Sequence, residues 1–395
     1  MVKTIPMIKS DYLKFIKRQE VRGKPIIDKI GKLNTFYLPL SKWIYSLYIK
    51  DRKIKIIGLS GGQGAGKSTI TGVLKLILKK KYGLNLCVFS IDDFYKTKAE
   101  RIKMSKNIHS LFLTRGVPGT HDLSLLNNTI RKLKQKKFKT VSIPKFDKSI
   151  DDRSQKYRWQ KIKHKPHIII FEGWCIGAIH QRNVELRKPL NQIEKEYDTD
   201  LKWRRTVNNL IKNQYKKLFD KIDKLVYLKV PHFNYILEWR WLQEQKMKLT
   251  SKNKKTMSKS QVKEFIMFYE RITKNMMRSF SKISDLTIFL DGSAANVLTL
   301  PAVSKGYELK VILTATGAAP TIVTDSSANV MVGTVLSATN DAAQAIQSDA
   351  DADTITFVDG AAPGDYCDLV CDGTNWYVFA FSGVDSKITI TKESA

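Results

Sequence analysis

Cysteine is scarce in this 395-residue sequence, which has only Cys87, Cys175, Cys367 and Cys371. Four such scattered residues exclude a disulfide framework, and no histidine near the last two completes a zinc set. No stretch approaches the roughly 20 apolar residues that span a bilayer. The first residues also lack the apolar core and cleavage site of a signal peptide. We therefore expect a cytoplasmic protein that does not associate with a membrane.

Acidic residues are few in the first three-quarters of the chain. Residues 1–291 carry a net charge of +39, whereas residues 292–395 carry −8 and contain no arginine. Such a change predicts two units, one over 1–291 and one over 292–395.

The positive charge raises the question of a nucleic acid partner. Only 15 of the 68 basic residues are arginine, which is the better ligand for phosphates and base edges. We therefore expect no nucleic acid partner, and keep a nucleic-acid-binding ATPase only as an alternative. The same field would steer an anionic small substrate toward the protein.

The strongest motif is the glycine-rich segment 61–68, GGQGAGKS, which fits G-x-x-x-x-G-K-[ST] at every fixed position. An apolar strand pattern over 53–60 precedes it, and helical spacing of apolar residues follows it. In that context the backbone N–H groups of the loop converge on phosphates, the lysine bridges the β- and γ-phosphates, and the serine hydroxyl binds Mg²⁺. The predicted nucleotide-binding residues are Gly61, Gly62, Gln63, Gly64, Ala65, Gly66, Lys67, Ser68 and Thr69.

Two further predicted strands end on carboxylates. The strand over 85–91 ends at Asp92 and Asp93, and the strand that begins at residue 167 ends at Glu172. Ligands gather at the carboxyl ends of strands in an open parallel sheet. We expect Asp92, in preference to Asp93, to accept the proton of an attacking hydroxyl, although either acid also fits a helix N-cap. We expect Glu172 to share the Mg²⁺ ion with Ser68.

The alternation of strands and helices predicts an α/β fold. Further strand patterns at 224–230 and 286–291 complete a mostly parallel sheet of the P-loop NTPase type, with helices on both faces. After residue 291, short alternating runs separated by turn residues predict a smaller all-β module. That module is either a unit for oligomerisation or attachment, or the product of an accidental join of two unrelated reading frames.

The order of these motifs resembles the uridine kinase, phosphoribulokinase and pantothenate kinase group of P-loop enzymes. It most closely resembles the plant and cyanobacterial type of D-glycerate 3-kinase, over nearly all of residues 35–291. The most specific matches are segment 114–122, TRGVPGTHD, and segment 143–149, IPKFDKS. The last part of the chain, at 372–378, has a short resemblance to phage tail-fibre and other virion β-modules.

This resemblance implies transfer of the γ-phosphoryl group of Mg-ATP to a primary hydroxyl of D-glycerate, which gives 3-phosphoglycerate. Asp92 falls where relatives keep their catalytic acid, and Glu172 falls at the strand-end acid. A nucleoside or a pantothenate-like molecule stays open as the acceptor.

An acceptor that carries a carboxylate requires cations, ideally an arginine fork. Arg115, Lys145 and Arg153 fall in turn-rich loops, where substrate contacts collect. We expect His121 and Asp122 to hydrogen-bond the acceptor's hydroxyls. The predicted substrate residues are Asp92, Tyr95, Arg115, His121, Asp122, Lys145, Asp147 and Arg153.

A helical pattern over 235–247 carries Arg240 and precedes a polar loop at 250–256. Phosphoryl transfer requires positive charge over the γ-phosphate and exclusion of water. We therefore predict a lid whose Arg240 closes on the phosphates, and a catalytic set of Lys67, Asp92, Glu172 and Arg240.

Overall fold

The computed structural model describes most of the chain up to residue 290 and scattered strands beyond it. The described residues are 5–20, 29–230, 232–250, 257–290, 297–299, 308–312, 321–323, 331–339, 342–347, 352, 354–358, 361, 364–372, 374–383 and 387–391. Residues 251–256 of the predicted lid and the predicted boundary between 291 and 292 lie outside the described residues.

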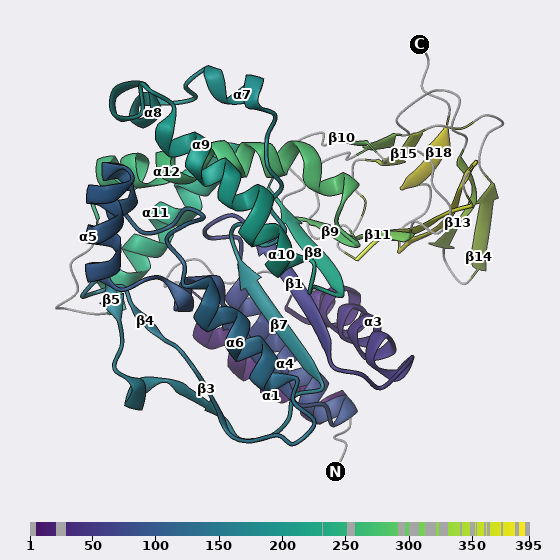
Figure 1. Ribbon diagram of the computed structural model, residues 1–395. Coiled ribbons are helices and arrows are strands. Elements are labelled where there is room, and N and C mark those ends of the chain that lie inside the picture. The colour runs from purple at the N-terminus through teal and green to yellow at the C-terminus, as the bar shows by residue number, and fades with distance from the viewer. Residues whose placement is uncertain are drawn as a thin grey trace.

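A parallel sheet forms the centre of the described structure (Figure 1). Its five parallel strands, in spatial order, are β2 (Leu86–Ser90), β7 (Ile168–Gly173), β1 (Lys55–Gly61), β8 (Lys224–Lys229) and β9 (Leu286–Phe289). All four pairings between them are parallel, so the five carboxyl ends share one edge. The predicted α/β fold with a mostly parallel sheet is confirmed.

Alternate side chains of these strands enter two different cores. Ile56 of β1 and Phe171 of β7 join one cluster, whereas Ile57 and Ile170 join the other. A strand buried on both faces reads as a continuous apolar run, which is what the sequence shows. The helices therefore have to cover both faces.

The helices fall into two layers that match these cores (Figure 1). One face is covered by α1 (Ile5–Gln19), α3 (Leu38–Ile49) and α4 (Lys67–Tyr82). The other face is covered by α6 (Leu123–Leu133), α9 (Lys202–Leu210) and α12 (Lys259–Ser279). None of the helices in the described part of the chain is long and apolar enough to cross a lipid bilayer.

Shorter elements connect this framework. They are α2 (Lys29–Lys32), η1 (Leu33–Tyr37), η2 (Ile91–Phe94), α5 (Lys98–Asn107), η3 (Ser110–Leu113), β3 (Val141–Ile143), β4 (Phe146–Asp147), β5 (Asp152–Arg153), η4 (Lys156–Arg158), β6 (Gln160–Ile162), α7 (Asn183–Arg187), α8 (Gln192–Tyr197), η5 (Ile211–Tyr215), α10 (Lys216–Phe219), α11 (Phe233–Thr250) and η6 (Phe280–Lys282). Two small antiparallel pairings, β3 with β6 and β4 with β5, hold the segment between α6 and β7.

Every element that the structure describes after β9 is a β-strand. These strands are β10 (Val297–Thr299), β11 (Glu308–Ile312), β12 (Thr321–Val323), β13 (Met331–Thr339), β14 (Ala342–Gln347), β15 (Thr354–Phe357), β16 (Tyr366–Cys371), β17 (Trp376–Ser382) and β18 (Ile388–Thr391). Strand β11 pairs in parallel with β9 and antiparallel with β16, so the central sheet continues into this region. The all-β character is as predicted, and the boundary at 291–292 stays a prediction.

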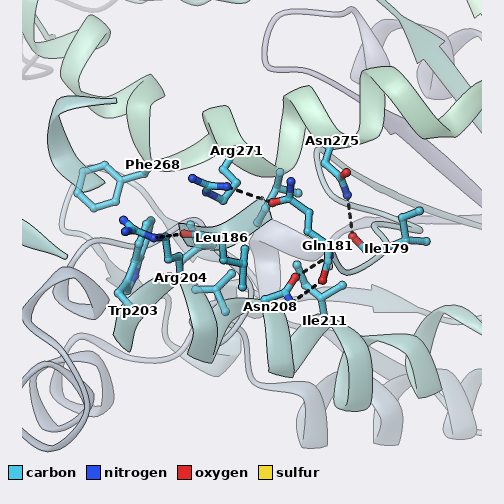
Figure 2. Close-up of a pocket in the computed structure, with 13 residues that line it drawn as sticks. Ile179, Gln181, Leu186, Trp203, Arg204, Asn208, Ile211, Phe268, Arg271 and Asn275 are labelled. Atoms are coloured by element: carbon cyan, nitrogen blue, oxygen red, sulfur yellow. Dashed lines mark hydrogen bonds between the residues drawn. The ribbon is translucent and has the colours of Figure 1, made fainter. Parts of the chain in front are cut away.

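A buried ionic network ties α8 and α9 to α12. Arg204 is 3% exposed and lies 3.3 Å from Asp198 and 3.8 Å from Glu194, both of which are fully buried. Arg271 of α12 donates two 2.6 Å hydrogen bonds to the carboxylate of Glu194. Figure 2 shows Arg204 and Arg271 with Trp203 and Phe268 around a small pocket between these helices.

Removing one partner of a buried ion pair leaves an uncompensated charge, which costs roughly 3–5 kcal/mol. We therefore expect Arg204→Ala to destabilise the protein by about 3 kcal/mol. The neighbouring Arg205→Ala, which removes an exposed arginine, is expected to change stability by less than about 0.5 kcal/mol. Urea denaturation of the two variants measures the difference, and equal stabilities would contradict the role given to this network.

Candidate functional site

The loop between β1 and α4 has the backbone geometry of a phosphate cradle. Gly64 and Gly66 have φ angles of +85° and +79°, in the left-handed region that favours glycine. A Cβ atom on Gly64 would lie 2.4 Å from the Cβ of Trp239, so α11 packs directly on this loop. A Cβ on Gly66 would meet nothing within 4 Å, which leaves open space where the loop enters the helix. A phosphate group fits that space, beside the N–H groups at the start of α4.

A pocket of about 530 Å³ opens beside the loop, a volume typical of small-molecule sites. It is lined by Gly64, Ala65, Gly66, Lys67, Ser68, Thr69, Gln19, Trp239, Leu242, Gln243 and Leu290. Six of the nine predicted nucleotide-binding residues are therefore on its wall. The other three, Gly61, Gly62 and Gln63, form the turn that leads from β1 into the loop.

The side chain of Lys67 folds back over its own loop. Its Nζ atom donates hydrogen bonds to the carbonyl oxygens of Gly61 (2.7 Å) and Gly62 (2.8 Å). Burial lowers the pKa of Lys67, while the charges of Glu172 and Asp92 act to raise it. The predicted lysine, base and metal ligand therefore share one electrostatic neighbourhood.

Glu172 lies at the end of β7, paired in register with Leu59 of β1 and Ser90 of β2. Burial raises the pKa of Glu172, and the charge of Lys67 partly offsets this. Among the described residues, its carboxylate has no hydrogen bond or ion pair. Ser68, the other predicted magnesium ligand, has an exposed side chain in the first turn of α4. A carboxylate and a hydroxyl are ligands that Mg²⁺ prefers, so these residues fit the ion.

The two acids after β2 have different roles. Ser90 caps η2, and Asp93 completes the capping box by accepting a 3.2 Å hydrogen bond from the Ser90 N–H. Asp92 instead accepts hydrogen bonds from the Tyr95 hydroxyl (2.9 Å) and from Lys148 Nζ (2.8 Å). The N-cap that sequence patterns allowed for either acid is therefore Ser90, and Asp93 is the acid that completes its capping box.

The pKa values of the two acids move in opposite directions. Burial raises the pKa of Asp93 to about 6. Burial also acts to raise the pKa of Asp92, but the charge and hydrogen bond of Lys148 outweigh it and lower the pKa to about 2. Asp92 is therefore ionised at neutral pH and can accept a hydrogen bond from a substrate hydroxyl.

His121 lies beside Asp92 and presents an unpartnered nitrogen. Its ring stacks on Tyr95 at a centroid distance of 4.6 Å, and its Nδ1 lies 2.7 Å from the Tyr215 hydroxyl. That hydroxyl also accepts the Gly119 N–H at 2.8 Å, and it can donate its own proton to Nδ1 when the imidazole proton is on Nε2. Within the described residues, Nε2 is buried without a hydrogen-bond partner, and burial lowers the pKa of His121 to about 4 despite the charge of Asp92. The imidazole is therefore neutral, and in this tautomer it presents a free N–H donor.

Two arginines come from different segments, Arg115 from the loop after η3 and Arg153 from β5. Arg153 Nη2 donates to the Tyr95 carbonyl oxygen (3.0 Å) and to Asp122 (3.1 Å), while its Nε is buried without a partner among the described residues. Arg115 forms an ion pair with Asp151 and lies over the Phe146 ring at 5.6 Å. Both cations are therefore held by carboxylates of this chain.

Several predicted substrate residues have structural partners. Asp122 caps α6, because its Oδ1 accepts the Leu125 N–H at 2.9 Å. Asp147 accepts hydrogen bonds from the backbone (2.9 Å) and hydroxyl (2.5 Å) of Ser149, and Lys145 is exposed. Among the predicted substrate residues, Tyr95 donates a hydrogen bond to Asp92, His121 stacks on Tyr95, and Arg153 bonds to the Tyr95 carbonyl oxygen and to Asp122.

Arg240, predicted to close on the phosphates, is paired within its own helix. Its guanidinium forms an ion pair with Glu244 and lies 5.8 Å from the Phe265 ring. Other residues of α11 contact the phosphate-binding loop, namely Trp239 at Gly64 and Ile236 at Gly62. The lid role of Arg240 stays a prediction.

Lys148 and Tyr269 were missed by reasoning from sequence. Lys148 falls inside the specific segment 143–149, but an exposed lysine in so basic a chain has no distinguishing signal. Tyr269 fits a helical core stripe, and it is buried. Its hydroxyl also donates to the Arg115 carbonyl oxygen at 3.3 Å, and its ring leaves room only for glycine at Gly116.

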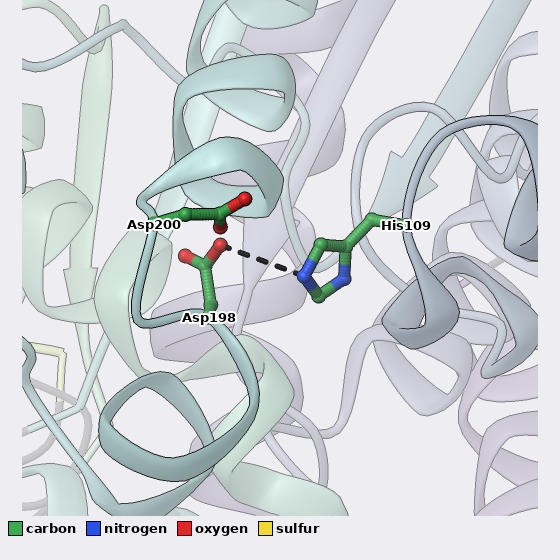
Figure 3. A group of neighbouring side chains, drawn as sticks. All are labelled: His109, Asp198 and Asp200. Carbon is green, nitrogen blue, oxygen red and sulfur yellow. Dashed lines mark ion pairs between the residues drawn. The ribbon is translucent and has the colours of Figure 1, made fainter.

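A second cluster, His109, Asp198 and Asp200, has the residue types of a metal site (Figure 3). Both carboxylate oxygens of Asp198 already have partners, because they accept hydrogen bonds from the backbone N–H groups of Trp203 and Arg204. His109 Nδ1 accepts the N–H that starts η3. The geometry of this cluster is explained by helix capping.

Comparison with known proteins places this geometry in a family context. A sequence model of the phosphoribulokinase / uridine kinase family matches residues 56–237. An uncharacterized kinase of Schizosaccharomyces pombe, mug58, is 36% identical over 222 residues, which make up 54% of this chain and 78% of that protein. The chloroplastic D-glycerate 3-kinase of Arabidopsis thaliana is 27% identical over 264 residues, or 62% of this chain and 55% of that enzyme.

Two further relatives bear on the acceptor. A uridine kinase of Macrococcus caseolyticus is 30% identical over 193 residues, which are 47% of this chain and 83% of that enzyme. The solved structure of a D-glycerate 3-kinase from Cryptococcus neoformans superposes with a TM-score of 0.52 at 27% identity, covering 61% of this chain and 87% of that one.

The carboxylate of Glu172 gives a direct test of the metal site. Glu172→Gln is expected to weaken binding of Mg-ATP about tenfold or more, because loss of even an outer partner of a metal ligand costs that much. Binding of metal-free ATP should weaken far less, since a negative charge near the phosphates is removed. Calorimetric titration with and without Mg²⁺ measures both, and the exposed Glu196→Gln is the control. Equal losses with and without the metal would contradict the assignment.

Proposed function

This chain belongs to the phosphoribulokinase and uridine kinase family of P-loop kinases, and on that premise we propose that it phosphorylates D-glycerate to 3-phosphoglycerate. Kinases of this family use ATP, with Mg²⁺ as the usual ion. The finer choice of acceptor is supported by two relatives named D-glycerate 3-kinase, one of them the plant enzyme. The strands after β9 contribute none of the site residues named above.

The acceptor proposal depends on one observation, the two buried N–H donors beside the base. His121 Nε2 and Arg153 Nε both lack a hydrogen-bond partner within the described structure. Both residues contact Tyr95, because Arg153 bonds to its carbonyl oxygen while His121 stacks on its ring. A buried donor without a partner costs about 1–3 kcal/mol, so this pair favours a ligand that brings oxygen atoms.

Glycerate has the chemistry that this pair and its surroundings require. Its carboxylate can accept hydrogen bonds from the arginines, and its hydroxyls can bond to His121 and to Asp92. Arg115 supplies a second guanidinium group, which forms an ion pair with Asp151. A neutral nucleoside base would not make use of two guanidinium groups.

The arrangement supports direct phosphoryl transfer. The ionised Asp92 accepts a hydrogen bond from the acceptor hydroxyl and takes its proton as the oxygen–phosphorus bond forms. Lys67 is positioned to leave its loop carbonyls for the β- and γ-phosphates. Ser68 and Glu172 would hold Mg²⁺, which supplies positive charge to the phosphate oxygens when bound. Trp239 packs against the loop at Gly64 and lines the pocket beside it.

A panel of acceptors tests the proposal. In a coupled assay of ADP release, we expect turnover with D-glycerate and little with uridine or pantothenate. Turnover with uridine and none with glycerate would overturn the choice of acceptor and leave the family assignment standing.

Arg115 should affect the KM for the acceptor and not the KM for the nucleotide. Loss of a charged hydrogen-bonding group costs about 1.5–3 kcal/mol, so Arg115→Ala should raise the KM for D-glycerate by about 10- to 100-fold. The KM for ATP should change less than about threefold. The exposed Arg131→Ala is the matched control, and an equal effect of both substitutions on glycerate would contradict the role of Arg115.

A further inference from the structure

Lys148 occupies a position that no function given so far explains. Its Nζ atom donates a 2.8 Å hydrogen bond to Asp92 Oδ2, yet 61% of its side chain is exposed. The backbone beside it is fixed, because Phe146 is buried and pairs with Arg153 in the β4–β5 ladder. Lys148 therefore has an exposed cationic side chain next to a backbone that strand pairing holds in place, at the edge of the site.

The charge of Lys148 acts on Lys67, Asp92, Asp93 and Glu172. Burial is the largest cause of the shifted pKa values of Lys67, Asp93 and Glu172, and the charge of Lys148 contributes to each of them. Lys148 is therefore within electrostatic range of the phosphate-binding loop as well as of the base.

A structural role does not account for this placement. An ion pair with so exposed a partner contributes little to stability. It also occupies one oxygen of Asp92 and holds that carboxylate at low basicity. Both effects make Asp92 a poorer proton acceptor for a substrate hydroxyl.

The geometry of transfer places the γ-phosphoryl group within reach of Lys148. A base must lie about 2.6–3.2 Å from the oxygen whose proton it takes, and that oxygen must lie about 3–3.5 Å from the phosphorus. The phosphorus is therefore within about 7 Å of the Asp92 carboxylate. An ammonium that starts 2.8 Å from Oδ2, on a flexible four-carbon stem, can cross to the phosphoryl oxygens.

We propose that Lys148 is a catalytic residue that leaves Asp92 and binds the γ-phosphoryl oxygens during transfer. The acceptor oxygen forms a bond to phosphorus, the bond from phosphorus to the bridging oxygen of ADP breaks, and the hydroxyl proton goes to Asp92. Lys148 stays protonated throughout and offsets the charge of the transferring group. Its departure frees Asp92 Oδ2 at the moment when the hydroxyl requires an acceptor. This inference rests on the proposed phosphoryl transfer at Asp92, and not on the identity of the acceptor.

Aluminium fluoride gives a test that requires no acceptor. With ADP and Mg²⁺ it mimics the transferring phosphoryl group, so wild-type protein should bind Mg-ADP more tightly when it is present. Lys148→Met should keep the affinity for Mg-ADP within about threefold and lose about tenfold or more of the gain from aluminium fluoride. Lys148→Arg, which keeps the charge, should retain part of the gain. Lys156→Met removes an exposed lysine of the same segment and should behave as wild type.

The outcomes separate this inference from the proposed acceptor. A full gain in Lys148→Met, no gain in the wild type, or an equal loss of plain Mg-ADP affinity would each overturn the role of Lys148. A gain that depends on Lys148 in a protein that does not phosphorylate glycerate would overturn the acceptor alone. Glycerate turnover that Lys148→Met leaves unchanged would overturn the inference and leave the acceptor standing. In the supporting case, the kcat for the accepted substrate falls about a hundredfold while the KM for ATP stays within about threefold.

Discussion

The parallel alignment of β2, β7 and β1 is the constraint on which the site depends. Because these strands run in the same direction, the loop after β1, the acid pair after β2 and Glu172 at the end of β7 meet at one edge. Those three segments are far apart in sequence, at residues 61–68, 92–93 and 172. The sheet itself is held by apolar side chains that alternate between two cores, so the position of the chemistry follows from the packing of residues that take no part in it.

The charges gathered at that edge are balanced within the chain. Lys67 and Lys148 lie among Asp92, Asp93 and Glu172, and each pKa shift records the burial of one group and the charge of its neighbours. Such a cluster is costly in free energy to assemble, because burial disfavours every charged member. Hydrogen bonds to the loop carbonyls hold the Lys67 ammonium and a hydrogen bond to Asp92 holds that of Lys148 until phosphates arrive, whereas Glu172 has no such partner among the described residues.

Sequence patterns predicted the framework of this site well. The glycine-rich loop, the strand-end acids and the layered α/β fold each have local signals, namely fixed motif spacing and apolar periodicity. What could not be predicted is which polar side chains already have partners. Asp122 and Asp147 look like substrate ligands in a turn-rich loop, yet one caps α6 and the other holds Ser149. Asp92 and Asp93 are separated by a local contact, the capping box that takes Asp93, and by a tertiary contact, the hydrogen bond of Lys148 to Asp92.

Asp92 accepts the proton of the attacking hydroxyl, while Asp93 stabilises the fold through the capping box of η2. Rapid-quench measurement of a single turnover, with Mg-ATP and the accepted substrate, tests this division of roles most directly in Asp92→Asn and Asp93→Asn. Asp92→Asn should slow transfer by about 10²- to 10⁴-fold with Mg-ATP affinity nearly unchanged, while Asp93→Asn should retain most of the rate. Fast transfer by Asp92→Asn together with slow transfer by Asp93→Asn would contradict it.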